Sequence, residues 1–227
     1  MHFSLLPKYR GAAPVQFALL NGEPKTGTTI FVLDEAMDRG PILSAAELGI
    51  DPTDTNPVLQ EKLAQISAEL LLDTLPKYQT GAIKPIEQDH DKATYTSLIS
   101  KTDGNVDWSK TAQEIYNKWR AYQPWPGIYT NWEGKTLKIL ECKVGPAQIG
   151  DPGEFRNNAI ICGNNTSLEL IGVQLEGKKR SGIGGFSPRT FQLYFEQIKT
   201  EDNFCFYLSY SPPRPAKIYW MYIVTSF

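Results

Sequence analysis

A histidine near the start of the chain and a carboxylate in a short loop are the residues best suited to acid–base chemistry. The sequence holds two histidines, His2 and His90, and Asp38 lies in the acidic segment 34–40. An imidazole can donate to an oxygen that gains negative charge, and a neighbouring carboxylate can orient the ring and favour its charged form. A lone histidine near a terminus is usually solvated, so Asp38 and the motif around His2 decide the interpretation. His2 and Asp38 are thus the candidate pair.

Metal and disulfide chemistry find little support in the sequence. The three cysteines, Cys142, Cys162 and Cys205, are scattered and odd in number, which does not suit a disulfide framework. Neither a CxxC nor an HxxxH spacing occurs, so we expect no metal site. The most apolar run, 218–224, is too short to cross a bilayer, and the first residues do not form a signal peptide. We therefore expect a cytoplasmic protein.

The two halves of the chain differ in charge. Residues 1–97 hold 8 Lys/Arg and 13 Asp/Glu, whereas residues 98–227 hold 15 and 12, within a net charge of −2. The composition, 41% hydrophobic and 21% charged, is that of a globular protein. An acidic half joined to a basic half indicates two domains, the second in contact with an anionic partner. Uneven surface charge without function is an equal alternative.

Two basic segments are candidates for ligand binding. The triplet 178–180 precedes a glycine-rich stretch, 181–185, and a basic turn beside flexible glycines suits contact with RNA phosphates. The stretch lacks the Lys-Ser/Thr ending of a phosphate-binding loop. Lys8 and Arg10 lie on the loop after the first histidine. Their side chains either bind substrate or are simply solvated, and the sequence leaves both alternatives open.

The elements that would position these residues alternate in type along the first half. Pro14 suits the first turn of a helix, and leucines from Leu59 to Leu75 recur at helical spacing, which predicts one apolar helix face. Proline and acidic residues in 81–96 indicate a linker, with a domain boundary near 90–98. The expected elements are a strand ending at Pro7, a helix at 12–21, a strand at 28–33 paired with 42–50, and a helix at 56–78.

The second half predicts a small antiparallel barrel. Short β-rich segments follow one another at hairpin spacing, separated by glycine-containing turns. Residues 191–227 hold 11 aromatic residues without a clear period, so we assign them no structure. The expected elements are a helix at 111–122 and strands at 128–132, 137–142, 159–162 and 167–175.

Several blocks carry a resemblance to a known family. HFSLLPKYRGAAP at 2–14, GTTI at 27–30 and MDRGPIL at 37–43 stand in an order and spacing that resemble the folate-dependent formyltransferases. The blocks 99–101, 106–108 and QPWPG at 123–127 are similar to the family members that act on methionyl-tRNA. The resemblance covers about residues 1–185.

The resemblance implies an α/β fold in two parts. Residues 1–92 would be the C-terminal part of a Rossmann-like formyltransferase catalytic domain, ending in a linker. Residues 93–190 would be a small antiparallel, OB-like β-barrel domain that binds tRNA, and 191–227 an atypical aromatic-rich tail.

The resemblance also implies an activity. A monomeric enzyme of translation initiation would move the formyl group of 10-formyltetrahydrofolate to the amino group of methionyl initiator tRNA, without a metal. The matching residues divide into catalytic ones, His2 and Asp38, and substrate-binding ones, Ser4, Leu5, Leu6, Pro7, Arg10, Lys178, Lys179 and Arg180.

One departure from the family pattern affects the expected activity. The family usually places an Asn two positions before this histidine, as a further donor to the formyl oxygen, and that position would precede Met1. We therefore expect a C-terminal portion of the enzyme, with little activity by itself. Two alternatives stay open: a relative that formylates a sugar amine or hydrolyses formyltetrahydrofolate, and an inactive RNA-binding remnant. The QPWPG block and the basic second half favour the tRNA enzyme.

Overall fold

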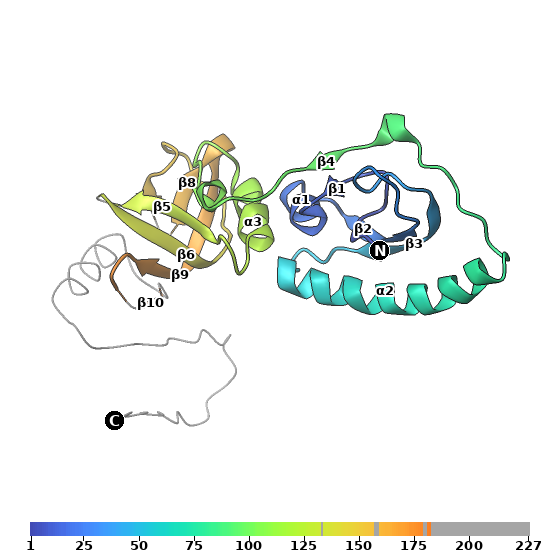
Figure 1. Ribbon diagram of the computed structural model, residues 1–227. Helices are drawn as coiled ribbons and strands as arrows, with labels where there is room; N and C mark the ends of the chain where they lie inside the picture. Colours follow the sequence, from blue (N-terminus) through green and yellow to red (C-terminus); the bar gives the residue numbers. More distant parts are fainter. Residues whose placement is uncertain (133, 157–158, 179–180, 183–227) are drawn as a thin grey trace, which may run out of the picture.

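The computed structural model describes residues 1–132, 134–156, 159–178 and 181–182. The expected tail at 191–227, the stretch 183–190 of the expected second domain, and Lys179 and Arg180 lie outside these described residues. The described elements form two groups, joined by an extended segment that contains β4 (Figure 1). One group holds β1–β3, α1 and α2, and the other holds α3 and β5–β10.

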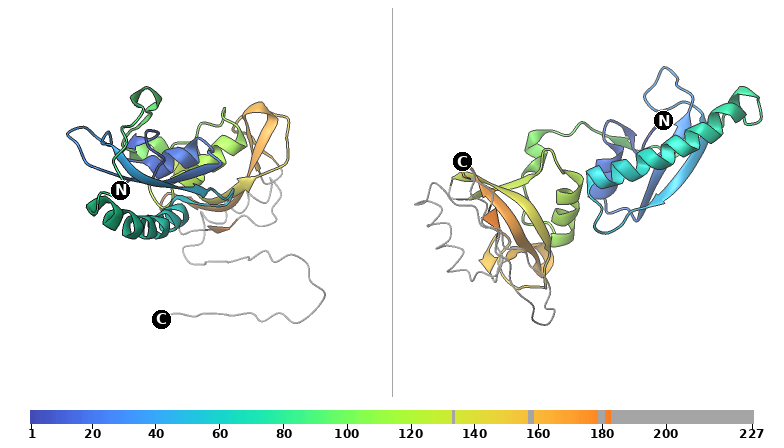
Figure 2. Two further views of the ribbon diagram at one scale, coloured as in Figure 1. Left: turned by 90° about the vertical axis from the view of Figure 1, so that its right-hand side faces the viewer. Right: turned by 90° about the horizontal axis from the view of Figure 1, so that it is seen from below.

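The first group is an antiparallel hairpin covered by helices. The helix α2 lies along the hairpin and contacts both of its strands (Figure 2). The expected strand pair and both expected helices are confirmed, and Pro14 occupies the first turn of α1. The elements are α1 (Pro14–Leu20), β2 (Lys25–Phe31), β3 (Ile42–Gly49) and α2 (Asn56–Gln79).

The buried face of α2 is less apolar than the leucine spacing predicts. Ser67 Oγ donates to Thr28 Oγ1 at 2.6 Å, and the hydroxyls of Thr74 and Ser44 lie 2.6 Å apart. The hydroxyl groups of the hairpin form hydrogen bonds with hydroxyl groups of the helix, because buried polar groups need partners. The expectation that Leu75 belongs to the buried face is wrong, since 47% of that residue is exposed.

The segment expected to be a linker returns to the first group and is held there. Its residues Tyr95–Thr96 form β4, which pairs in parallel with β1 (Arg10–Gly11). Ile86 exchanges two backbone hydrogen bonds with Ile42 of β3, at 2.7 and 2.8 Å. The segment is irregular, as expected, but it is a packed part of the structure rather than a free spacer.

The second group is one helix against an antiparallel sheet. The helix α3 (Ala112–Ala121) begins at a capping box, in which Thr111 and Glu114 bond each other's backbone N–H groups. The expected helix and strands are confirmed, while closure of the sheet into an OB-like barrel stays a prediction. The strand order is β5–β6–β9–β8–β7 with β10 on β9, and the strands are β5 (Ile128–Trp132), β6 (Lys135–Val144), β7 (Phe155–Arg156), β8 (Ala159–Cys162), β9 (Thr166–Leu175) and β10 (Ser181–Gly182).

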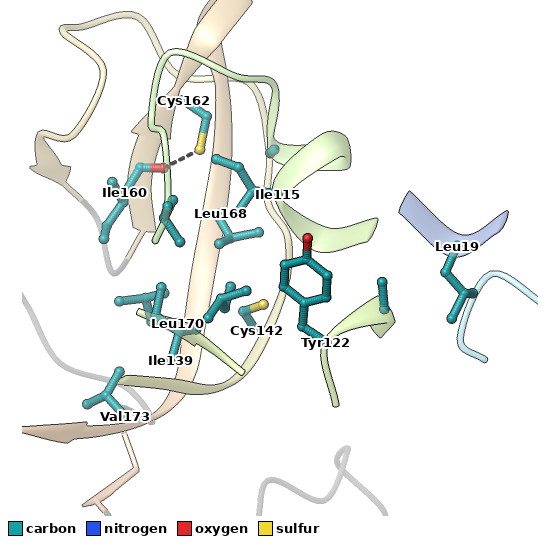
Figure 3. Packing of buried hydrophobic residues seen from close by; sticks show 14 of the residues in the cluster. Leu19, Ile115, Tyr122, Ile139, Cys142, Ile160, Cys162, Leu168, Leu170 and Val173 are labelled. Carbon is teal, nitrogen blue, oxygen red and sulfur yellow. Dashed lines mark hydrogen bonds between the residues drawn. The ribbon is translucent and has the colours of Figure 1, made fainter. Parts of the chain in front are cut away.

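Buried hydrophobic side chains from both groups form one cluster. Leu19 of α1, Ile115 of α3 and Leu168 of β9 are members, and Figure 3 shows Ile115 and Tyr122 between Leu19 and the sheet. Arg120 of α3 also crosses the boundary, because its guanidinium donates to the backbone oxygen of Asp54 at 3.1 Å. The boundary expected at 90–98 divides the sequence, but the core continues across it.

The described cysteines are buried inside the second group of elements. Cys142 and Cys162 are free and buried, and burial raises the pKa of the Cys162 thiol to about 12. Within the described ranges, no group of three or more His, Cys, Asp or Glu side chains could hold a metal ion. Among the described helices, none combines the length and apolarity that crossing a membrane requires.

The helix α2 offers a matched test of this packing. Leu63 is fully buried and Leu72 is 75% exposed, so the same substitution should have different effects at the two sites. We expect Leu63→Ala to lower the free energy of unfolding by about 2–5 kcal/mol and Leu72→Ala to change it by less than about 0.5 kcal/mol. Urea denaturation followed by circular dichroism measures both. Equal effects would contradict the placement of α2.

Candidate active site

His2 is anchored to the hairpin by its backbone. Its N–H donates to Thr29 O and its carbonyl accepts from Thr29 N–H, both at 2.9 Å. The side chain is 8% exposed, and Nε2 lies 2.9 Å from the backbone oxygen of Tyr9. Because a carbonyl can only accept, this contact assigns a proton to Nε2. The strand expected to end at Pro7 is reduced to this single bridge, which fixes the position of His2, while the Tyr9 carbonyl fixes the rotation of its ring.

Asp38 faces the other ring nitrogen. Its Oδ2 lies 3.6 Å from Nδ1 of His2 and accepts a hydrogen bond from the backbone N–H of Gly11 at 2.8 Å. The carboxylate is 19% exposed. The distance to His2 is too long for a direct hydrogen bond. The two side chains predicted to form a pair are thus brought together, with Nδ1 as the nitrogen whose hydrogen-bonding position is open.

The loop that carries Asp38 requires two special backbone positions. Asp38 itself has a φ of 53°, in the left-handed region that is uncommon for residues other than glycine. At Gly40, an added Cβ would lie 1.7 Å from the backbone oxygen of Val32, so only glycine fits there. This close approach lets the loop turn back sharply towards β3.

The SLLP segment after His2 is held by side-chain contacts to its backbone. Ser4 Oγ donates to Lys8 O at 2.6 Å, and Thr29 Oγ1 both donates to Ser4 O and accepts from Leu6 N–H. Ser4 and Leu6 are buried, whereas Leu5 and Pro7 are partly exposed. Their predicted contacts with substrate stay predictions. The geometry shows that Ser4 and Leu6 shape the loop from inside.

Tyr9 follows this segment and is held by contacts of its own. Its backbone has a φ of 60°, and its N–H donates to Thr94 Oγ1 at 2.8 Å. Its hydroxyl donates to Glu23 at 2.6 Å and accepts from Asn21 at 3.0 Å. Burial raises the pKa of the Tyr9 phenol, the hydrogen bond from Asn21 lowers it, and the one to Glu23 raises it further. Tyr9 is therefore fixed at both its backbone and its ring.

Arg10 lies in the interior, with 1% of its surface exposed. Its guanidinium contacts Gln88 Oε1 at 2.7 Å, His90 Nδ1 at 2.9 Å and the Tyr95 hydroxyl at 3.3 Å. The predicted contact of Arg10 with substrate stays a prediction. In the structure, its donors are directed to the segment 88–95, which the sequence indicated only as a linker.

Gln88 is the residue near the site that the sequence did not single out. It is 5% exposed, and its Nε2 donates to Asp38 O at 2.9 Å and to Gly40 O at 2.7 Å. A glutamine between proline and aspartate residues follows no periodic pattern, so no signal in a single sequence separates it from a surface residue. Its contacts place it directly against the loop that carries the candidate carboxylate.

The predicted basic triplet is described only at its first residue. Lys178 is half-buried; its backbone N–H donates to Leu175 O, and its carbonyl accepts from Gln174 Nε2. A surface cavity nearby is lined by polar, aromatic and aliphatic residues: Lys101, Trp125, Pro126, Tyr129, Thr136, Lys138, Gln174, Leu175, Glu176 and Gly177. This cavity lies in the second group of elements, whereas His2 and Asp38 lie in the first group.

Comparisons with known proteins agree over both groups. Residues 1–75 match the model of the formyl transferase domain, and residues 98–187 match that of the formyl transferase C-terminal domain. A methionyl-tRNA formyltransferase of Koribacter versatilis is 42% identical over 198 residues, which are 84% of this chain and 63% of that protein. One of Chloroflexus aurantiacus is 43% identical over 182 residues, which are 77% and 58%.

Solved structures share the fold. The N-formyltransferase from Helicobacter canadensis, in complex with folinic acid and dTDP-3-aminofucose, matches with a TM-score of 0.62 and 22% identity over 74% of this chain and 64% of that one. HypX from Aquifex aeolicus, in complex with tetrahydrofolic acid, matches with a TM-score of 0.61 and 17% identity over 92% and 37%. The two adjacent domain matches and the identity of about 40% to curated relatives, of whose length the chain spans about 60%, show that it belongs to the formyltransferase family.

Proposed function

We propose that this protein is an enzyme that transfers a formyl group from 10-formyltetrahydrofolate to the amino group of methionyl initiator tRNA. The observation that carries the proposal is the His2–Asp38 pair, with Nδ1 and Oδ2 3.6 Å apart, inside the segment that matches the formyl transferase domain. The relatives of about 40% identity are named methionyl-tRNA formyltransferases. The substrates are proposed from that name, and the roles of the residues from their geometry.

The proposed reaction needs proton transfer and stabilisation of an oxyanion. The amine nitrogen forms a bond to the formyl carbon, the bond from that carbon to the folate nitrogen breaks, one proton leaves the amine and one reaches the folate nitrogen. The formyl oxygen carries negative charge in between. His2 donates to this oxygen from Nδ1, because Nε2 is already bonded to Tyr9 O. Asp38 acts on the ring through its negative charge, because Oδ2 lies 3.6 Å from Nδ1, too far for a hydrogen bond between them.

The two groups of elements are assigned different functions in this proposal. We propose residues 1–92 as the catalytic part and 93–190 as the part that binds tRNA. The cavity of the second group supports this, because it combines Trp125, which is 57% exposed, with the exposed cations Lys101 and Lys138. Exposed aromatic rings beside lysines suit unpaired bases and phosphates. A cytoplasmic location follows from a tRNA substrate.

The amine that accepts the formyl group distinguishes the proposed tRNA enzyme from a sugar-amine formyltransferase. We expect the complete protein that carries these residues to formylate methionyl initiator tRNA with 10-formyltetrahydrofolate, and to leave a dTDP-linked amino sugar unmodified. Acid-gel separation of formylated tRNA and mass spectrometry of the sugar nucleotide measure the two transfers. Transfer to the sugar alone would replace the proposal with that of a sugar formyltransferase, and binding of tRNA without either transfer would favour a remnant.

Asp38→Asn tests the candidate pair. The substitution keeps the shape and removes the negative charge that faces Nδ1 of His2, so we expect kcat to fall by about 100- to 10,000-fold in the complete protein. The melting temperature should change little, since a partly exposed loop carboxylate has little packing to lose. Glu35→Gln, an exposed change in the same loop, is the control. Turnover near that of the unmodified protein would refute the role of Asp38.

The basic triplet is tested by the salt dependence of tRNA binding. We expect Lys178→Ala/Lys179→Ala/Arg180→Ala to weaken binding and to reduce the slope of log K against log salt by about two to three, because each of three phosphate contacts contributes about 0.7–0.9. The control Lys77→Ala/Lys84→Ala/Lys92→Ala removes three exposed charges from the first group. Filter binding measures both slopes. Equal slopes for the two triple variants would remove the triplet from the interface.

A further inference from the structure

The side-chain amide of Gln88 makes four hydrogen bonds in the interior. Oε1 accepts from Arg10 Nη2 at 2.7 Å and from Arg10 Nε at 3.3 Å. Nε2 donates to Asp38 O at 2.9 Å and to Gly40 O at 2.7 Å. The orientation of the amide is unambiguous, because a guanidinium can only donate and a carbonyl can only accept. Both ends of the amide are therefore fully used.

These contacts form a closed circuit around the Asp38 turn. The side chain of Arg10 holds Gln88, Gln88 holds the backbone of Asp38 and Gly40, and the Asp38 carboxylate accepts from Gly11 N–H at 2.8 Å. Arg10 and Gly11 are the two residues of β1, so the circuit begins and ends on one short strand. The strand is in turn paired with β4, which fixes its own position.

The turn needs such support. Asp38 has a φ of 53°, a left-handed conformation that is unfavourable for a residue with a Cβ. Its neighbours Met37 and Arg39 are exposed, so packing of their side chains does not hold the loop in place. The two carbonyls that Gln88 bonds lie on either side of Arg39. Gln88 thus fixes the part of the loop from which the carboxylate projects towards His2.

We propose that Gln88 is a positioning residue for the reaction, acting through Asp38. It keeps the turn in the conformation that places Oδ2 3.6 Å from Nδ1 of His2. The role of Gln88 in the reaction rests on the proposed function, whereas its role in holding the Asp38 turn does not. The position requires an amide: a carboxylate could accept from Arg10 but not donate to the carbonyls, and a cation could donate but not accept.

Gln88→Glu is the sharpest test of the geometry. It keeps the size of the side chain and the bond to Arg10, and it sets a carboxylate against the two loop carbonyls. The Gly11 amide proton reports the position of the Asp38 carboxylate, because it donates to that group. We expect its resonance in a ¹H–¹⁵N spectrum to move in the same direction as in Asp38→Asn. Gln65→Glu, an exposed change on α2, should leave it in place.

A second variant guards against a failure to fold. Gln88→Asn keeps the amide but is one methylene shorter, so it cannot reach Arg10 and both carbonyls together, and it introduces no charge. It should move the Gly11 resonance in the same direction. An unchanged Gly11 resonance in a folded variant of either kind would overturn the inference.

Kinetics in the complete protein test the link to catalysis. We expect Gln88→Glu to lower kcat by about 10- to 100-fold, with KM for both substrates within about twofold, because misplacement of a catalytic group affects the transition state. In an Asp38→Asn background the same change should lower kcat by less than about twofold, since the group it positions is already gone. Independent, multiplying effects would overturn a role through Asp38.

The two failures are distinguishable. If the complete protein transfers formyl but Gln88→Glu retains full kcat, Gln88 has no positioning role and the proposed function stands. If the complete protein transfers no formyl group, the proposed function fails, and the Gly11 resonance still decides whether Gln88 holds the Asp38 turn.

Discussion

The loops around the candidate site have few backbone partners of their own, and the need to satisfy their polar groups governs the local structure. The N-terminal segment pairs with β2 only at His2 and Thr29. Beyond that bridge, side chains take the place of a neighbouring strand: Thr29 Oγ1 bonds the backbone at Ser4 and Leu6, and Gln88 bonds that at Asp38 and Gly40. Because a buried backbone group without a partner costs free energy comparable to a lost hydrogen bond, these side chains fix the loops.

Packed helices connect the site to the second group of elements. The loop that follows His2 leads directly into α1, and α1 packs against α3. Arg120 of α3, 4% exposed, then bonds the backbone oxygen of Asp54, which precedes α2. Because interiors are close-packed, a displacement of α3 is transmitted to α1 and α2 rather than absorbed between them. The second group of elements is therefore packed against the helices that flank the candidate site.

The sequence predicted the elements and the types of the candidate residues more fully than their contacts. The helices at 12–21 and 56–78 were predictable because apolar spacing and Pro14 are local signals. The contact between Arg10 and Gln88 was not, because a buried polar pair joins residues 78 positions apart and leaves no periodic trace. The polar face of α2 was missed for a related reason. Ser67 is buried because of Thr28 on another element, and spacing within the helix carries no information about its partner.

The imidazole of His2 lies between two residues in left-handed backbone conformations, Tyr9 with a φ of 60° and Asp38 with a φ of 53°. Each such residue costs about 1–3 kcal/mol and persists only where the surroundings over-determine it. Here both are over-determined: Tyr9 by Thr94, Glu23 and Asn21, and Asp38 by Gly11 and Gln88. If either set of contacts were lost, the strained residue would relax and its acceptor would leave the ring. The pair His2–Asp38 is thus a property of the whole network, since neither residue holds the other at 3.6 Å.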